Sequence, residues 1–287
     1  MQALGGIAAA VAQEKGVAGP AGSFVIDDAA TAVARSLMAG ERKAVLLGNA
    51  AAHHAQATQL LALANWIGEH TGATVGYLTE AANTVGAQFV GAHPVKGGLN
   101  AAQMLSGGLK AVLLLNNEPV HDSSVGARAT DALSGAEMVV TLSPFKANME
   151  FSDVLLPIAP FTETSGSFIN AEGRLQSFHA VVRPLGDTRP AWKVLRVLAN
   201  MLEIPGFDFE TSQDVLVRAT NAAPGAFSRI DAAQLSNAVT GGVTASVSGA
   251  VGEPVVASIY QLDGLVRRSP SLQLTADARM AREEVAA

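Results

Sequence analysis

The segment that decides the fold is "KAVLLLNNEPVHDSSVGARATDALSGAEMVVTLSP", residues 110–144. It holds two short apolar runs, 111–115 and 138–142, and residues 123–136 between them predict a helix. Strands that are apolar throughout and separated by helices are typical of a parallel sheet covered on both faces. The segment therefore predicts a strand–helix–strand unit of an α/β fold.

The same alternation extends to both sides of this unit. Before it, Leu60, Leu61, Leu63, Ala64 and Ile67 fall largely on one face of a predicted helix. We therefore predict a mostly parallel α/β sheet with helices on both faces. Further strands are expected at 43–50, 73–78 and 151–159, and helices at 1–16, 54–72, 99–108 and 189–206.

The alternation of predicted strands and helices changes after Pro144. "SDVLLPIAPFTETSGSFINAEGRLQSF", residues 152–178, predicts a strand followed by a long polar loop. Residues 220–255 are poor in charge and predict a weakly specified connector, and the tail after it predicts a strand, a polar turn and a short helical end. We expect one α/β domain over 1–220 and a less regular extension over 221–287.

Composition excludes several classes of function. The chain of 287 residues has no cysteine, so it can form no disulfide, thiolate-held cluster or Cys-ligated zinc site. The net charge is −6 and no basic run is longer than a pair such as Arg267–Arg268, which disfavours nucleic acid as a partner. The apolar runs are too short to cross a bilayer, so we expect no direct membrane insertion.

The familiar catalytic motifs are absent or incomplete. The turn after the 43–50 strand has one glycine, Gly48, where the dinucleotide fingerprint needs three, and "TSGSF" lacks the GxSxG spacing. The six histidines show no HExxH or HxxxH spacing, so we expect no metal site and no catalytic residue. Glu163 and Glu172 could serve as an acid–base pair, but carboxylates in such a loop more often accept backbone amides.

Taken in order, several segments resemble a known family. "GNAAAHHAQATQLLALANWIGEHTG", "KAVLLLNNEP", "FSDVLLPIAPFTETSGSFINAEGRLQSF" and the tail "IYQLDGLVRRSPSLQLTADA" follow the layout of the molybdopterin oxidoreductase superfamily. Within it, the chain resembles the large iron–sulfur subunit of bacterial NADH:quinone oxidoreductase, respiratory complex I. The resemblance covers about residues 24–278 and is weakest in the connector.

The resemblance implies that 161–177 descends from a loop that packs near a pterin-linked guanine dinucleotide. The chain departs from a working molybdenum site because it has no cysteine ligand and lacks the Thr-Glu-Thr pattern between Phe145 and Asp153. We therefore expect no cofactor in this chain, with Asn170, Glu172 and Arg174 locking the turn and Thr162–Ser167 shaping its surface. The vestigial loop candidates are Thr162, Glu163, Gly166, Asn170, Glu172, Gly173 and Arg174.

The complete large iron–sulfur subunit also has an N-terminal region whose cysteines and histidine hold iron–sulfur clusters. This sequence resembles only the C-terminal part, as a truncated gene, a split gene or a misplaced start codon would give. The resemblance implies a non-catalytic part of a proton-pumping NADH dehydrogenase complex at the cytoplasmic face of the bacterial inner membrane. Its expected partners are the other peripheral-arm subunits, with 259–278 as a candidate contact or, equally, as a tail that closes its own domain. The alternative is a molybdopterin guanine dinucleotide-binding portion of a molybdenum enzyme, with a polar groove around Gly48, Asn117 and Thr162.

Overall fold

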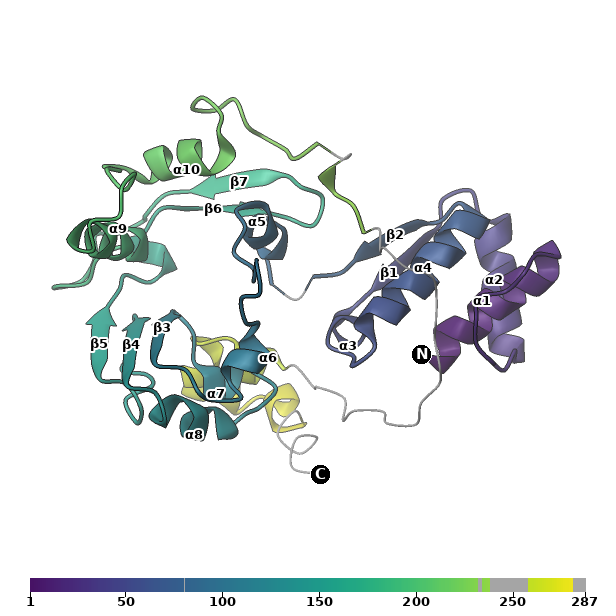
Figure 1. Cartoon of the computed structure of the whole chain (residues 1–287), viewed down its shortest axis with the longest axis horizontal. Helices are drawn as coiled ribbons and strands as arrows, with labels where there is room; N and C mark the ends of the chain where they lie inside the picture. The colour runs from purple at the N-terminus through teal and green to yellow at the C-terminus, as the bar shows by residue number, and fades with distance from the viewer. Residues whose placement is uncertain (80, 232–233, 238–257, 281–287) are drawn as a thin grey trace. The chain divides into compact units, whose positions relative to one another are not determined.

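The computed structural model describes all residues except 80, 232–233, 238–257 and 281–287 (Figure 1). It divides into two compact units, which we describe separately. Unit 1 comprises 1–84, 170–174 and 229–255, and unit 2 comprises 85–169, 175–228 and 256–287. These units divide the chain at points other than residue 220, so the predicted boundary there stays a prediction. No helix of the described residues is long and apolar enough to cross a membrane.

Unit 1 combines a two-stranded parallel sheet with three long helices, of which the last in the chain packs on both strands. The helices are α1 (Gln2–Lys15), α2 (Asp28–Ala39) and α4 (Ala57–Thr71), with the single turn α3 (Asn49–Ala52), and the strands are β1 (Ala44–Leu47) and β2 (Thr74–Tyr77). Ala8 of α1 packs with Leu63 and Ile67 of α4, all fully buried. Gly6 of α1 lets the Val25 backbone approach the helix closely, because a Cβ on Gly6 would lie 2.7 Å from the Val25 carbonyl oxygen.

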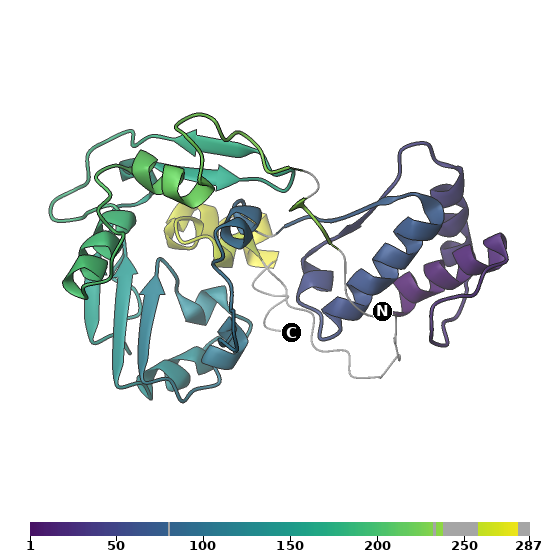
Figure 2. The same ribbon diagram turned by 45° about the horizontal axis from the view of Figure 1, so that its top comes forward.

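Unit 2 is built on the three-stranded parallel sheet β3 (Ala111–Leu115), β4 (Met138–Ser143) and β5 (Val154–Pro157), with β4 in the centre (Figure 2). The crossover between β3 and β4 contains α7 (Pro119–Asp122) and α8 (Arg128–Ser134). Ala129 and Leu133 of α8 pack with Val139 and Phe151 in the core. The predicted fold class is confirmed, and its parallel strands fall in two sheets.

The remaining helices of unit 2 have recognisable ends. α9 (Ala191–Met201) begins after Pro190, as predicted, and α10 (Ser212–Thr220) begins with a capping box formed by Thr211 and Asp214. α5 (Thr84–Phe89) is followed by α6 (Ala101–Met104), which lies within the helix predicted over 99–108, and Gly107 and Gly108 after it have positive φ. The helix over 212–220 was missed because its apolar residues are few.

The long polar loop predicted over 161–177 is wrong. After the 3-10 turn η1 (Phe161–Glu163), the chain forms an antiparallel hairpin of β6 (Gly166–Ile169) and β7 (Leu175–Phe178). Two four-residue β-prone segments flank the turn residues Asn170 and Gly173, and the Phe168 and Phe178 rings meet edge to face at 5.5 Å. The hairpin was not predicted because its strands are short and the residues between them are polar, as in a loop.

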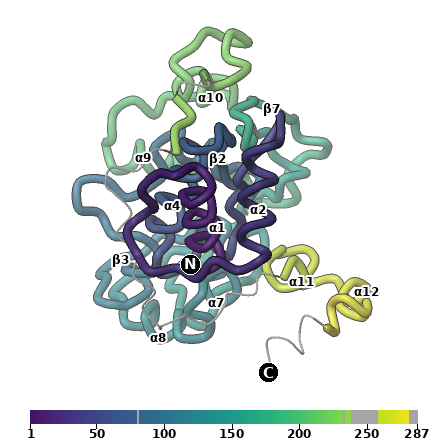
Figure 3. Tube along the Cα trace, turned by 90° about the vertical axis from the view of Figure 1, so that its right-hand side faces the viewer, coloured from purple at the N-terminus to yellow at the C-terminus, as the bar shows by residue number. Residues whose placement is uncertain are grey.

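The tail is helical where a strand was predicted. It forms α11 (Ile259–Leu262), η3 (Val266–Arg268) and α12 (Pro270–Gln273), drawn in yellow in Figure 3. Ser258 starts α11 because its hydroxyl accepts the Tyr260 amide, which favours a helical turn over an extended chain. The connector prediction for 220–255 falls largely on residues outside those the structure describes.

Candidate functional site

The turn of the β6–β7 hairpin is held by Asn170. Its side-chain oxygen accepts the amides of Glu172 at 3.1 Å and Arg174 at 2.9 Å, and its carbonyl accepts the Gly173 amide at 2.8 Å. Gly173 has φ +79°, and a Cβ there would lie 2.9 Å from the Leu235 side chain. Position 173 therefore requires glycine for both conformation and space.

Glu172 and Arg174 contribute to this turn through their backbones. The Glu172 carbonyl accepts the Arg229 Nε at 3.1 Å, and Arg174 forms an antiparallel bridge with Arg229. Both side chains are exposed, and neither forms an ion pair with a described residue. The turn is thus stabilised by the side chains of Asn170 and Arg229 and by main-chain bonds.

Thr162 and Glu163 bind a second loop, residues 180–185. The Thr162 carbonyl accepts the amides of Val181 at 2.9 Å and Val182 at 3.3 Å. Glu163 accepts the Leu185 amide at 2.9 Å, which is the kind of bond expected for a carboxylate in such a segment. Gly166 begins β6, and a Cβ there would meet the Phe178 ring at 2.6 Å.

A hollow of about 480 Å³ opens beside η1 and this loop. Arg183, Arg189 and Lys193 bring three cations to its walls, against the single carboxylate of Glu163. The other lining residues are Thr164, Ser165, Ala180, Pro184, Pro190, Trp192 and Ser212. The hollow is therefore electropositive.

Unit 2 has a second polar region at the carboxyl edge of its parallel sheet, where α/β proteins generally bind ligands. Asn117 and Glu118 follow β3, and Phe145 and Asn148 follow β4. The Asn148 amide group donates to the Asn117 carbonyl at 2.9 Å and joins the two loops. Gly48 lies in unit 1, so the groove predicted around Gly48, Asn117 and Thr162 stays a prediction.

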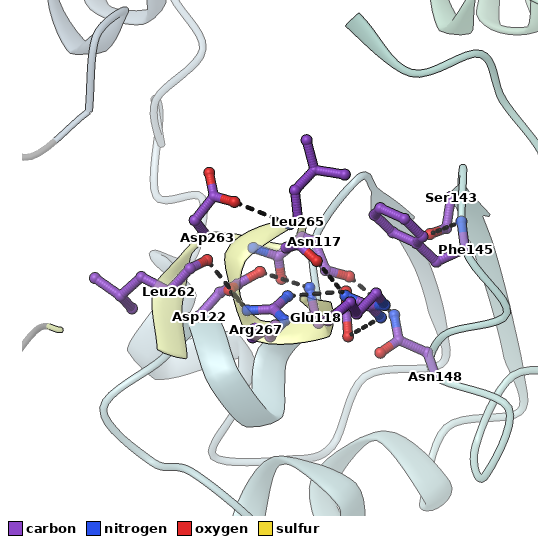
Figure 4. A network of polar contacts seen from close by, with 12 residues as sticks. Asn117, Glu118, Asp122, Ser143, Phe145, Asn148, Leu262, Asp263, Leu265 and Arg267 are labelled. Atoms are coloured by element: carbon purple, nitrogen blue, oxygen red, sulfur yellow. Dashed lines mark hydrogen bonds and ion pairs between the residues drawn. The ribbon is translucent and has the colours of Figure 1, made fainter. Parts of the chain in front are cut away.

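The tail covers this edge with a network of ion pairs (Figure 4). Arg267 contacts Glu118 at 2.8 Å and Asp122 at 3.1 Å, and also donates to the carbonyls of Gln261 and Leu262. Its side chain is only 10% exposed. The two partner carboxylates lie 145 or more residues earlier in the chain, so the contact joins the tail to the β3–β4 crossover.

Arg268 also binds the tail to the carboxyl edge of the sheet. It reaches Glu118 at 2.8 Å, and its guanidinium lies 4.1 Å from the centre of the Phe145 ring at the end of β4. Asp263 accepts the amides of Leu265 and Val266, and Gln273 donates to the carbonyls of Tyr260 and Val266. These bonds make α11, η3 and α12 one folded segment.

The network shifts the pKa values of its members. Burial raises the pKa of Glu118, but hydrogen bonds and charge from Arg268 and Arg267 outweigh it, so the pKa lies below its usual value. Burial lowers the pKa of Arg267, and its bonds to Glu118 and Asp122 outweigh that effect and raise it. Glu118 is therefore ionised, and Arg267 charged, throughout the physiological range.

The remaining space at this edge is about 360 Å³, near the lower end for small-ligand pockets. It is lined by Glu118, His121, Tyr260, Gln261, Arg267, Arg268 and Gln273. Within the part of the chain that the structure describes, no cluster of three or more His, Asp or Glu residues could hold a metal ion.

The fold is an α/β domain with parallel strands, and comparison with known proteins gives its family. The model of the family described as "Molybdopterin oxidoreductase" matches residues 28–201, more than half of the chain. The chain therefore belongs to the molybdopterin oxidoreductase family.

Similar proteins include "Probable oxidoreductase YjgC" of Bacillus subtilis, 37% identical over 75 residues, which are 26% of this chain and 8% of that protein. Another is "Putative formate dehydrogenase SAB2186c" of Staphylococcus aureus, 42% identical over 59 residues, 21% of this chain and 6% of that protein. The matched stretches thus span less than a tenth of these relatives.

The residues at the carboxyl edge do not fit the dinucleotide form of the cofactor that the family name implies. The phosphates of a pterin-linked guanine dinucleotide need cationic or amide donors, and at this edge Arg267 and Arg268 are already bound to the Glu118 carboxylate. The tail segment lies over the same loops. Binding here would require the tail to leave.

The sequence did not reveal this network. The tail with Arg267 and Arg268 was predicted to contact a partner or, equally, to close its own domain, and the structure joins both arginines to Glu118 of the same chain. An isolated acid after an apolar strand and an adjacent arginine pair were the only local signals. Their pairing depends on the tertiary fold.

Proposed function

We propose that this chain is a structural, cofactor-free domain within a multisubunit oxidoreductase. The specific proposal is the C-terminal portion of the large iron–sulfur subunit of bacterial NADH:quinone oxidoreductase, respiratory complex I. It would lie in the peripheral arm, at the cytoplasmic face of the membrane, and contribute packing surface while other parts hold the iron–sulfur clusters. In this role the chain has no catalytic residue of its own.

One observation carries this proposal. The carboxyl edge of β3–β4 is covered by the chain's own residues 259–273, anchored by the Arg267–Glu118–Asp122 network. A domain that binds a cofactor at this edge would keep its polar groups available for the ligand. Here the same groups bind one another.

The hairpin candidates have structural roles in this proposal. Thr162 and Glu163 hold loop 180–185, Gly166 leaves room for Phe178, and Asn170 with Gly173 forms the tight turn. Glu172 and Arg174 connect to Arg229 through their backbones. Every candidate thereby has a role that needs no ligand.

A second candidate function is supported by the relatives. One of them is named as a formate dehydrogenase, which favours a portion that binds molybdopterin guanine dinucleotide in a molybdenum-dependent oxidoreductase. In that case the tail segment would have to be displaced from the carboxyl edge. The two proposals thus predict opposite cofactor contents.

Affinity purification of the tagged full chain from membrane extracts of its native host separates the two. The first proposal predicts recovery of NADH:quinone oxidoreductase subunits with iron, and without molybdenum or pterin. Stoichiometric molybdenum and pterin without those subunits would overturn it in favour of the second. The tag expressed alone at the same level is the control for nonspecific recovery.

A further inference from the structure

Loop 180–185 presents large apolar side chains to solvent. Val181 is 82% exposed and Leu185 is 78% exposed, and Val182 and the neighbouring Phe161 are also exposed. Isolated exposed apolar residues are ordinary, but several on one loop and its anchoring turn mark an interaction surface.

This loop is held in place although its side chains are exposed. Three of its amides bind η1: those of Val181 and Val182 donate to the Thr162 carbonyl, and that of Leu185 donates to Glu163. The Thr188 amide then donates to the Leu185 carbonyl at 3.1 Å, which closes the next turn. A preformed loop loses little conformational entropy when it binds.

The electropositive hollow adjoins the apolar side chains. Arg183 lies in the loop itself, and among the described residues its side chain has no hydrogen-bond or ion-pair partner. The Lys193 ammonium lies 5.3 Å from the centre of the Trp192 ring and has no hydrogen-bond or ion-pair partner among the residues that the structure describes. Arg189 donates to the carbonyls of Gly186 and Thr188. The nearby acid Asp187 does not line the hollow, and Glu163 already accepts an amide.

We propose that loop 180–185 and the adjoining hollow are the docking surface for an acidic segment of a partner protein, with apolar side chains set among its carboxylates. Complementary charge selects this occupant, because three cations line a hollow in a chain whose net charge is −6. The same net charge opposes a second copy of the chain. Membrane adsorption commonly uses about four to eight clustered Lys or Arg, and three around a concave hollow fall short of that.

The inference deepens the proposed function, on which it rests for the existence of a stable partner. Its test uses the full chain in the native host, with the photo-cross-linking residue p-benzoylphenylalanine placed at Leu185. Val25, an apolar residue of similar exposure in unit 1, is the matched control position. We expect Leu185 to cross-link to one partner peptide rich in Asp or Glu beside apolar residues, and Val25 to give no such product.

Charge variants decide whether the hollow takes part. The double change Arg183→Glu and Lys193→Glu should lower the cross-link yield roughly tenfold, because two attractive rim charges become repulsive. Arg183→Lys keeps the charge and should retain the yield. All these side chains are exposed, so folding is preserved.

Several results would overturn the inference: equal yields at Leu185 and Val25, products with lipid or a second copy only, peptides without carboxylates, or insensitivity to charge reversal. If purification still recovers the complex subunits while Leu185 gives no partner product, the docking surface is wrong and the proposed function stands. If purification recovers no subunit, the proposed function itself fails.

Discussion

Two groups of arginines in unit 2 have opposite environments. Arg267 is nearly buried and bound to two carboxylates and two carbonyls, whereas Arg183 is exposed and unpartnered among the described residues. The first group lies at the carboxyl edge of the sheet, where the fold would place a ligand, and the second lies beside η1. At the edge where the fold would place a ligand, the arginine therefore binds groups of the same chain. The arginine beside η1 remains available to bind a partner.

The largest expected change in stability comes from removing Arg267, which holds the tail to the β3–β4 crossover. Arg267→Ala removes the shared partner of the half-buried Glu118, which keeps Arg268, and of the more exposed Asp122, and we expect a loss of about 2 kcal/mol in the free energy of unfolding of unit 2. Chemical denaturation followed by hydrogen exchange of β4 measures this loss. The matched control Arg183→Ala should change stability by less than about 0.5 kcal/mol. Equal losses of stability in Arg267→Ala and Arg183→Ala would contradict the difference between the two arginines.

A pH effect follows from the depressed pKa of Glu118. Because the folded pKa lies below the unfolded value, the stabilisation is present above the unfolded value and is lost as pH falls through the folded pKa. We therefore expect the tail to become sensitive to proteolysis in acid, well before loop 180–185 changes. Glu118→Gln should show a weakened tail at neutral pH and little further loss in acid. A tail whose sensitivity does not change with pH in the wild type would contradict this explanation.

A smaller loss of stability is expected from changes in the turn of the β6–β7 hairpin. Asn170→Ala removes the acceptor of two backbone amides and should cost about 1 kcal/mol. Asn170→Asp keeps an acceptor and should retain most of the stability. Thermal unfolding monitored at the hairpin by hydrogen exchange compares them, and identical melting of both variants would show that the side chain does not hold the turn.

The smallest effect is expected at Glu163. Glu163→Ala removes the bond to the Leu185 amide and should increase exchange of that amide, with a stability loss of about 0.5–1 kcal/mol. Glu163→Gln keeps an oxygen acceptor and should protect the amide as the wild type does. Unchanged exchange in Glu163→Ala would mean that loop 180–185 is held by Thr162 alone.

The sequence predicted elements wherever a local pattern was strong. The apolar runs at 111–115 and 138–142 located β3 and β4. Four of the five residues predicted for one face of α4 are buried, and the fifth, Leu61, is half-buried. The hairpin was missed because its strands are only four residues long and rich in polar residues. The tail was misread because Ile259–Leu262 is apolar and begins with a β-branched residue, while the Ser258 cap makes it helical.

The site was less predictable than the fold. That Glu163 would accept a backbone amide could be inferred from residue type, and the structure gives its partner as Leu185. The pairing of Arg267 with Glu118 could not be inferred, because nothing local links two residues so far apart in sequence. Such contacts depend on chain topology, which periodicity does not specify.

Closure of the carboxyl edge of β3–β4 by the chain's own tail is the feature on which the proposed function depends. Hydrogen exchange of residues 259–273 in the full chain at neutral pH tests it most directly, because the Val266 and Arg267 amides both donate to Asp263. We predict slow exchange in the wild type and fast exchange in Arg267→Ala. Exchange of the wild-type tail as fast as that of an unfolded peptide would contradict closure and reopen the edge to a ligand.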